Sequence, residues 1–321
     1  MAAPAARSVG RLEVTDRPTL RRFQSARFWS AFRLTFVTLF GLGIAVFEVA
    51  MLVLEDVDRT WLPVFVYIFF GVLVAVSALR GLVARRRTRA HRVEVSPEAS
   101  VEIVVDDFLG NLDRFPRASC VFGVNDRFAV EDLAPTSLHA HFLDTYATST
   151  ESAARQSELD AVLEKYGIDP GTAGALDDDA RKRHPGGTVV AVPFGEGAGA
   201  ARYAFLLVNS SRGTLGFTRV EEDAHVRAVW DFHVKKRHVS DEVVFSLVGT
   251  GESRRLGKIQ SAVEIIDEYF TQREHDPHPS IRRLIISIHP ETVVTGEVDL
   301  EVLYNYLDAR AAVHRAMSTP A

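Results

Sequence analysis

Two long apolar runs near the N-terminus dominate the hydrophobic pattern of the chain. The first, residues 34–54, holds one charged side chain, Glu48, and the second, residues 61–79, holds none. Each run has about the 20 residues that a helix needs to cross the hydrocarbon core of a bilayer, where a helix satisfies its own backbone groups. The pattern therefore predicts a two-helix transmembrane hairpin over residues 34–84, with a short acidic connector at 55–60.

Arginines flank both runs, and the connector is acidic. They lie at positions 17, 21, 22, 27 and 33 before the first run, and at 80, 85, 86, 87, 89 and 92 after the second. The positive-inside rule then places both termini in the cytoplasm. We expect a basic segment at 1–33 and a basic linker at 85–98. The alternative is a buried helical hairpin in a soluble core, which would not need arginines at both ends.

Small residues recur at a spacing of four in both runs. Gly41 and Ala45 form one pair, and Gly71 and Ala75 form the other. This spacing lets membrane helices approach closely, although glycine and alanine are also common in such helices. Glu48 is costly in lipid unless it faces other helices or water. It lies either near the membrane end or at a polar contact in a homo-oligomer.

From residue 99 onward, apolar strands alternate with amphipathic helices. Strands are predicted at 101–105, 118–124, 188–193, 203–209, 243–248 and 283–289, and helices at 157–166, 221–237, 256–270 and 300–312. Such alternation is typical of an α/β fold with a largely buried mixed sheet and helices on both faces. We expect one domain over residues 99–313 and a tail at 314–321.

Charge and cysteine content indicate which binding partners and which cellular compartment suit the chain. The net charge is −5, so no general nucleic-acid binding is indicated, and the arginines beside the apolar runs suit anionic membrane lipids. The single cysteine, Cys120, lies in an apolar run and cannot form an internal disulfide, in agreement with a reducing cytoplasm. The histidines do not form a zinc-ligand set, and no catalytic residue or metal site is predicted.

The strongest chemical motif follows the strand predicted at 243–248. Its residues are Gly249, Thr250, Gly251, Glu252, Ser253 and Arg254, and the next helix takes its first apolar residue from Leu256. Glycines let the backbone approach a ligand closely, and the free N–H groups of a helix start bind anions. The motif thus predicts a phosphate-binding loop, or alternatively a tight turn, since it is neither a P-loop nor a complete G-x-G-x-x-G.

Polar residues also follow the strand at 118–124. Asn125 and Asp126 stand where ligands bind in open α/β sheets, at the carboxyl end of a strand. Asp126 could accept a hydrogen bond from an adenine amino group, and Phe128 could stack on the base. The alternative is an Asx-turn that closes the strand. Phe194 and Gly195 begin a third candidate, a glycine-rich loop after the strand at 188–193, which could also be a wide turn.

These motifs together resemble those of a macro domain. The matching pieces are the strand VFGVN followed by Asp126, the strand TVVAVPFG, and the segment FSLVGTGESRRLG, which is similar to the second phosphate loop of that family. The order of hairpin and domain resembles the membrane-bound macro effectors of Thoeris anti-phage defence in bacteria. The segment SLHAHF at 137–142 and the strand YAFLLVN are similar to that group as well.

The resemblance implies a mostly parallel mixed sheet and a ligand, ADP-ribose or an ADP-ribose conjugate such as histidine-ADP-ribose, with no cofactor. It implies a multi-pass protein of the inner membrane that is activated by a nucleotide signal from a TIR-domain partner and then disrupts the membrane as an oligomer. The Gly-Gly-Val loop of hydrolytic macro domains is missing after Asn125, which favours binding over catalysis. A membrane-tethered ADP-ribosyl hydrolase and a structural anchor without ligand are the alternatives.

Overall fold

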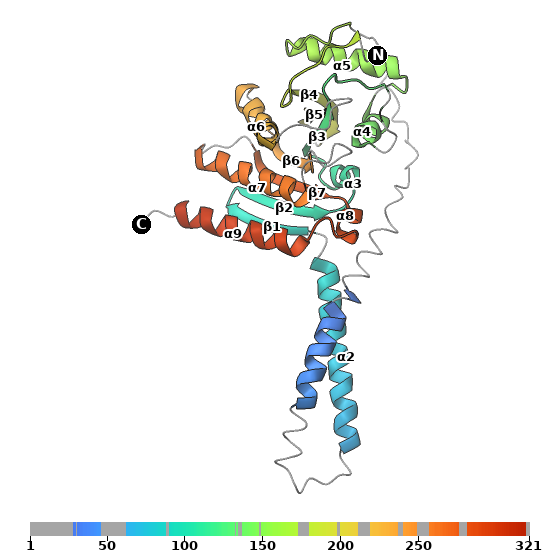
Figure 1. Cartoon of the computed structure of the whole chain (residues 1–321), viewed down its shortest axis with the longest axis vertical. Coiled ribbons are helices and arrows are strands. Elements are labelled where there is room, and N and C mark those ends of the chain that lie inside the picture. Colours follow the sequence, from blue (N-terminus) through green and yellow to red (C-terminus); the bar gives the residue numbers. More distant parts are fainter. Residues whose placement is uncertain are drawn as a thin grey trace. The chain divides into compact units, whose positions relative to one another are not determined.

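The structure is a computed structural model, and it falls into two units, Met1–Arg89 and Ala90–Ala321 (Figure 1). It describes residues 28–29, 31–45, 62–87, 90–131, 133, 137–147, 149–172, 180–197, 200–210, 219–236, 240–248, 257–275 and 281–318.

Phenylalanine rings join the two helices of the N-terminal unit. Phe32, Phe36 and Phe40 recur every four residues in the first helix, so their rings stack along one face with centroids 5.9 Å apart at each step. The ring of Phe40 reaches Phe70 of α2 (Leu62–Arg87) at 5.7 Å. Aromatic pairs of this kind stabilise a helix contact beyond the area that they bury.

The glycines at this contact are not the ones that the spacing singled out. A side chain at Gly43 would overlap the ring of Phe69, and one at Gly81 would meet the ring of Phe28 at 2.7 Å, whereas Gly41 and Gly71 have open space around them. Ala45 and Ala75 are exposed as well. The two small-residue pairs therefore do not form the contact within the hairpin, because glycine is needed where the rings pack. Glu48 lies outside the described residues.

The outer surface of α2 is apolar. Tyr67, Ile68 and Leu79 are each more than half exposed, at 79%, 60% and 63%. Within the parts of the chain that the structure describes, no helix has both the length and the apolar character needed to cross a membrane. The transmembrane hairpin stays a prediction.

The C-terminal unit is built on one mixed sheet. Its strand order is β1-β2-β7-β6-β3-β5-β4. The five inner strands run parallel, and β1 and β4 are antiparallel edges. The bounds are β1 (Ala90–Ser96), β2 (Ala99–Val105), β3 (Ser119–Asn125), β4 (Val189–Gly197), β5 (Ala200–Ser210), β6 (Ser240–Ser246) and β7 (Ile281–Ile288). The predicted mixed, mostly parallel sheet is confirmed.

Helices cover both faces of this sheet, as predicted. On one face, the ring of Phe122 packs against Phe142 of α4 (Leu138–Tyr146) at 4.9 Å and against Phe108 of α3 (Phe108–Arg114) at 6.1 Å. On the other face, Phe205 contacts His233 of α6 (Arg219–Lys236) at 4.3 Å. Here α7 (Lys258–His275) and α9 (Leu300–Ser318) lie side by side (Figure 1).

Two further helices complete the unit. The helix α5 (Ser152–Lys165) packs near β4, and α8 (Pro290–Val294) follows β7. The strands and helices predicted from the apolar pattern are all present; the strand bounds agree within four residues and the helix bounds within six. The short helices α3, α4 and α8 were not predicted, because each offers too few turns for a clear period.

Two boundaries of the predicted domain need correction. The expected linker 85–98 contains β1, whose apolar side chains are few because its outward face carries Arg92 and Glu94. The expected tail begins inside a helix, because α9 continues to Ser318 and His314 packs against Phe270 at 5.5 Å. An alternating edge strand and an alanine-rich last turn both give a weak hydrophobic signal.

The first prediction concerns His139 of α4, a buried imidazole whose two ring nitrogens have no hydrogen-bond partner. Burial lowers the pKa of His139 to about 4, whereas an unfolded histidine titrates near pH 6.5. The unfolded chain therefore binds the proton more tightly. The stability that this residue contributes is complete above pH ~6.5 and falls by roughly 3 kcal/mol as the pH drops to ~4.

Urea unfolding between pH 7 and pH 4 measures this slope. His139→Leu should flatten it, and His141→Leu, on the exposed side of the same helix, should leave it as in the wild type. An unchanged slope in His139→Leu would contradict the assignment.

Candidate functional site

The carboxyl ends of the five parallel strands meet at one edge of the sheet, the edge where open α/β sheets bind ligands. Asp106 follows β2 at this edge, Asn125 and Asp126 lie at the end of β3, and Ser210 ends β5. Asn125 is the register partner of Ser210. The edge thus gathers polar groups from strands that are far apart in sequence.

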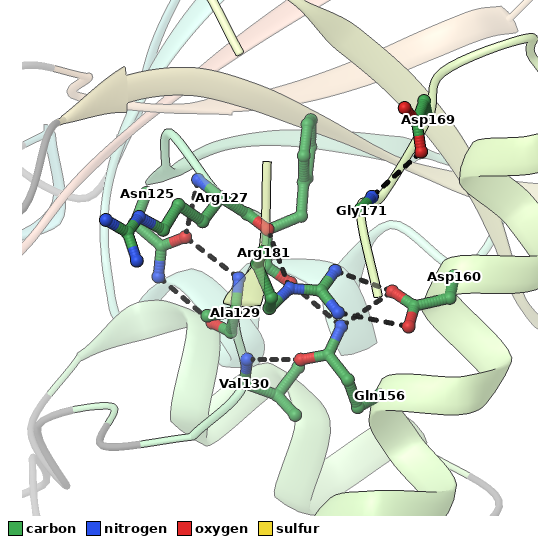
Figure 2. A network of polar contacts seen from close by, with 10 residues as sticks. Asn125, Arg127, Ala129, Val130, Gln156, Asp160, Asp169, Gly171 and Arg181 are labelled. Carbon is green, nitrogen blue, oxygen red and sulfur yellow. Dashed lines mark hydrogen bonds and ion pairs between the residues drawn. The ribbon is translucent and has the colours of Figure 1, made fainter. Parts of the chain in front are cut away.

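Asn125 uses its side chain to shape the chain that follows it (Figure 2). Its Oδ1 accepts from the backbone N–H groups of Arg127 at 3.2 Å and Ala129 at 2.9 Å, and its Nδ2 donates to the carbonyl of Ala129 at 3.0 Å. The Asx-type turn, one of the two interpretations of the sequence, is therefore present. The carboxamide of Asn125 organises the loop.

Asp126 differs from Asn125, because its carboxylate does not organise the backbone of the loop. The residue is 5% exposed, and its Oδ1 is buried without a hydrogen-bond partner. Leaving a buried acceptor unsatisfied costs about 1–3 kcal/mol or more when the group is charged. Asp126 therefore places an unsatisfied acceptor at the carboxyl edge of the sheet.

His184 lies beside Asp126 and was not predicted from the sequence. Its backbone N–H donates to the carbonyl of Asp126 at 2.7 Å, and its Nε2 is buried without a partner. Burial, followed by the charges of Lys182 and Arg181, lowers the pKa of His184, and the charges of Asp169 and then Asp126 partly offset this. A histidine in a charged, turn-forming segment carries no sequence signal that would have joined it to Asp126.

Phe128 is not free to stack on a base. Its side chain is fully buried and lies 5.5 Å from the ring of His184. Its backbone has a φ of +50°, the left-handed region that non-glycine residues rarely adopt. The expectation that this ring faces a ligand is wrong, because the turn at Asn125 directs it into the core.

A buried polar network fixes this unusual backbone (Figure 2). From α5, Gln156 donates through Nε2 to the carbonyl of Phe128 at 3.2 Å and accepts through Oε1 from the N–H of Val130 at 2.9 Å. The same Nε2 donates to Asp160 at 2.9 Å. One side chain of α5 thus holds the loop through both of its amide atoms.

Arg181 completes the network. Its guanidinium makes two bonds to the carboxylate of Asp160, at 3.0 and 2.6 Å, and its Nε donates to the carbonyl of Arg127 at 3.0 Å. Both side chains of the ion pair are almost fully excluded from solvent. Removal of either partner of a buried ion pair is strongly destabilising. Through these bonds, α5 and the segment around Arg181 clamp the loop that carries Asp126.

Phe194 and Gly195 lie at the opposite edge of the sheet from Asn125. Since β4 is antiparallel to β5, its last residues lie beside the first residues of β5, and Asn125 pairs with the last one, Ser210. β5 spans 11 residues, so its two ends are roughly 33 Å apart. The structure therefore separates the third candidate from the second.

Phe194 instead belongs to an aromatic cluster. The guanidinium of Arg202 lies 4.5 Å from its ring centroid, and the rings of Tyr146 and Phe142 lie 5.0 and 5.1 Å away. Arg202 also donates to the carbonyls of Ala118 and Leu112, at 3.0 and 3.1 Å. These contacts give Phe194 a packing role.

The proposed phosphate loop, Gly249 to Leu256, lies outside the described residues. The elements on either side of it are described. β6 is parallel to β3, with Phe245 in register with Val121, so both strands end at the same edge. The first turn of α7 is anchored by the hydroxyl of Ser261, which donates to the carbonyl of Val248 at 2.8 Å.

The described residues contain no group of three or more histidine, cysteine, aspartate or glutamate side chains that could hold a metal ion. Cys120 is fully buried, and this burial raises the pKa of its thiol. A buried thiol of this kind is a packing residue, as its place in an apolar run indicates.

Comparison with known proteins gives distant structural matches. No family model and no curated protein matches the chain. Two solved structures, both mutants of a macrodomain from Oceanobacillus iheyensis, are similar at 12% sequence identity. They cover 70% and 67% of this chain and 92% and 98% of theirs, with TM-scores of 0.41 and 0.42. Similarity at this level assigns no activity to the chain.

The second prediction tests the clamp. Asp160→Asn leaves the buried guanidinium of Arg181 without its counter-charge, and we expect the free energy of unfolding to fall by about 3 kcal/mol or more. Asp144→Asn is the matched control, because Asp144 is 61% exposed and pairs with Arg155 near the surface; its effect should stay below ~1 kcal/mol. Chemical denaturation of both variants makes the measurement, and equal effects would contradict a special role for the buried pair.

Proposed function

We propose that the C-terminal unit binds ADP-ribose or an ADP-ribose conjugate at the carboxyl edge of its sheet. The observation that carries the proposal is the buried, unpartnered Oδ1 of Asp126 at that edge. It requires a donor, and the exocyclic amino group of adenine is one. The Nε2 of His184 offers a second buried polar atom beside it.

The diphosphate binds at the segment 249–256. Its glycines let phosphate oxygens approach the backbone, and the start of α7 adds free N–H groups and the positive end of the helix dipole. Ser253 and Arg254 supply further donors. The register of β6 against β3 supports this proposal, because the end of β6 lies at the edge that holds Asp126.

The site binds its ligand without chemistry. Asn125 is engaged in its turn and Phe128 in the core, so neither is available to act on a substrate. The second candidate function, ADP-ribosyl hydrolysis, needs a positioned base or nucleophile. The observation in its favour is the Oδ1 of Asp126, which has no hydrogen-bond partner. Release of ADP-ribose from a modified amino acid distinguishes the two functions.

The N-terminal unit anchors this binding domain to a membrane, and the protein acts as an effector. Support comes from the two apolar runs, the arginines on either side of them, and the exposed apolar side chains of α2. A TIR-domain partner supplies the nucleotide signal, and binding shifts the protein toward oligomers that disrupt the inner membrane. A ligand can do so only if it binds the assembled state more tightly than the resting state.

The third prediction concerns the ligand. Asp126→Asn keeps the shape of the side chain but replaces an acceptor with a donor on one side, so ADP-ribose should bind roughly tenfold to a hundredfold more weakly. Gly251→Glu places an anion where the phosphates bind and should abolish binding. Calorimetry on the full chain in mild detergent measures both affinities.

Asp113→Asn is the control for this measurement, since it removes the same charge from an exposed position on α3. Wild-type affinity in a folded Asp126→Asn variant would exclude this carboxylate from the site. Unchanged affinity in Gly251→Glu would do the same for the loop.

The fourth prediction concerns topology. A cysteine introduced at Asp58 should react with a membrane-impermeant thiol reagent in whole cells, and one introduced at Arg89 should not. The background is low because the chain holds one cysteine, Cys120, which is buried. Labelling at position 89 but not at position 58 would show that the orientation is the reverse of the predicted one. If neither position reacts in whole cells and both react equally after lysis, the prediction of a membrane span is wrong.

A further inference from the structure

The outer edge of β1 is a surface that the proposed site does not use. β1 pairs with β2 on its inner side, and no other described strand pairs with it. An edge strand presents backbone N–H and C=O groups that can continue the sheet with another strand. Arg92 and Glu94 lie on either side of Val93 along this edge, with 48% and 76% of their side chains exposed.

We propose that two copies of the chain pair through β1, antiparallel, around a two-fold axis at Val93. This register places Arg92 of each copy opposite the other copy's Glu94. Opposite charges across an antiparallel ladder are stabilising and like charges are destabilising. An axis at Arg92 or at Glu94, or an in-register parallel pair, would instead set identical charges against each other, so the charge pattern selects one register.

The position of α9 supports a second copy as the occupant of this edge. α9 packs over β1, where Nε2 of His91 lies 3.0 Å from Asp308 and the His91 ring stacks on Tyr304 at 4.5 Å. A two-fold axis across the outer edge of β1 places the α9 helix of each copy on the same face of the continued sheet, beside the other.

One side chain has to move for this pairing. Arg315 of α9 donates to the carbonyl of Glu94 at 2.9 Å, and it occupies an edge carbonyl that a partner strand would use. Its side chain is exposed, so it can turn into solvent when the second strand arrives. This interface rests on the proposed function, because it supplies a contact for the oligomer proposed there. It is formed by protein alone and needs no nucleotide.

The test is a charge exchange in the full chain, purified in mild detergent without nucleotide, with mass measured by analytical ultracentrifugation. Arg92→Glu and Glu94→Arg each set like charges across both pairs of the two-fold interface, and each should weaken dimerisation by about tenfold or more. The double variant with both changes restores opposite pairs and should dimerise like the wild type.

Mixing the two single variants separates contacts between copies from the Arg92–Glu94 contact within one chain, which is 3.8 Å long. One variant then carries two acidic residues and the other two basic residues, so differently tagged copies should form a mixed dimer that neither variant forms alone. A disulfide between two Val93→Cys copies, absent in Glu164→Cys on the exposed side of α5, places the axis.

A monomeric wild type at about 100 µM, or two single variants that associate no better together than apart, overturns the proposal. Circular dichroism confirms that each variant is folded. Because no nucleotide is present, a failure here leaves the nucleotide site untouched, and a failure of calorimetric binding leaves this interface untouched.

Discussion

The loop that carries Asp126 depends on one buried guanidinium. Arg181 binds the carboxylate of Asp160 through two nitrogens and the carbonyl of Arg127 through a third. Gln156, one turn before Asp160 on α5, fixes the backbone at Phe128 and Val130. These bonds support a left-handed residue and a buried carboxylate that would otherwise favour other conformations. A backbone that is fixed in this way loses little conformational entropy when a ligand binds, so under the proposed function the clamp contributes to binding as well as to the fold.

The same arrangement explains why neighbouring residues with similar chemistry have different roles. Asn125 closes the turn, Asp126 holds a buried acceptor without a hydrogen-bond partner, and Phe128 packs in the core. Each outcome follows from the direction that the backbone takes after β3. The candidate site therefore consists of fewer residues than the motif suggests, and it includes His184, which the backbone of Asp126 holds at 2.7 Å.

Much of the fold could be predicted from the sequence, because buried strands and amphipathic helices leave a periodic apolar pattern. The direction of a strand leaves no such pattern. The sequence therefore did not indicate that β4 runs antiparallel to β5, which places Phe194 at the edge of the sheet opposite Asn125. The edge strand β1 was missed because charged residues alternate along it. The ion pair between Asp160 and Arg181, 21 residues apart, could not be predicted, since only the folded chain brings those residues together.

The central claim is that ADP-ribose binds at the carboxyl edge of the sheet. Hydrogen–deuterium exchange of the full chain with and without ADP-ribose tests it directly, because it reports on each segment separately. The account predicts slower exchange in peptides that cover residues 124–131 and 246–258, with no change around residues 193–203 at the opposite edge. Protection confined to the opposite edge, or no protection anywhere at saturating ADP-ribose, would contradict it.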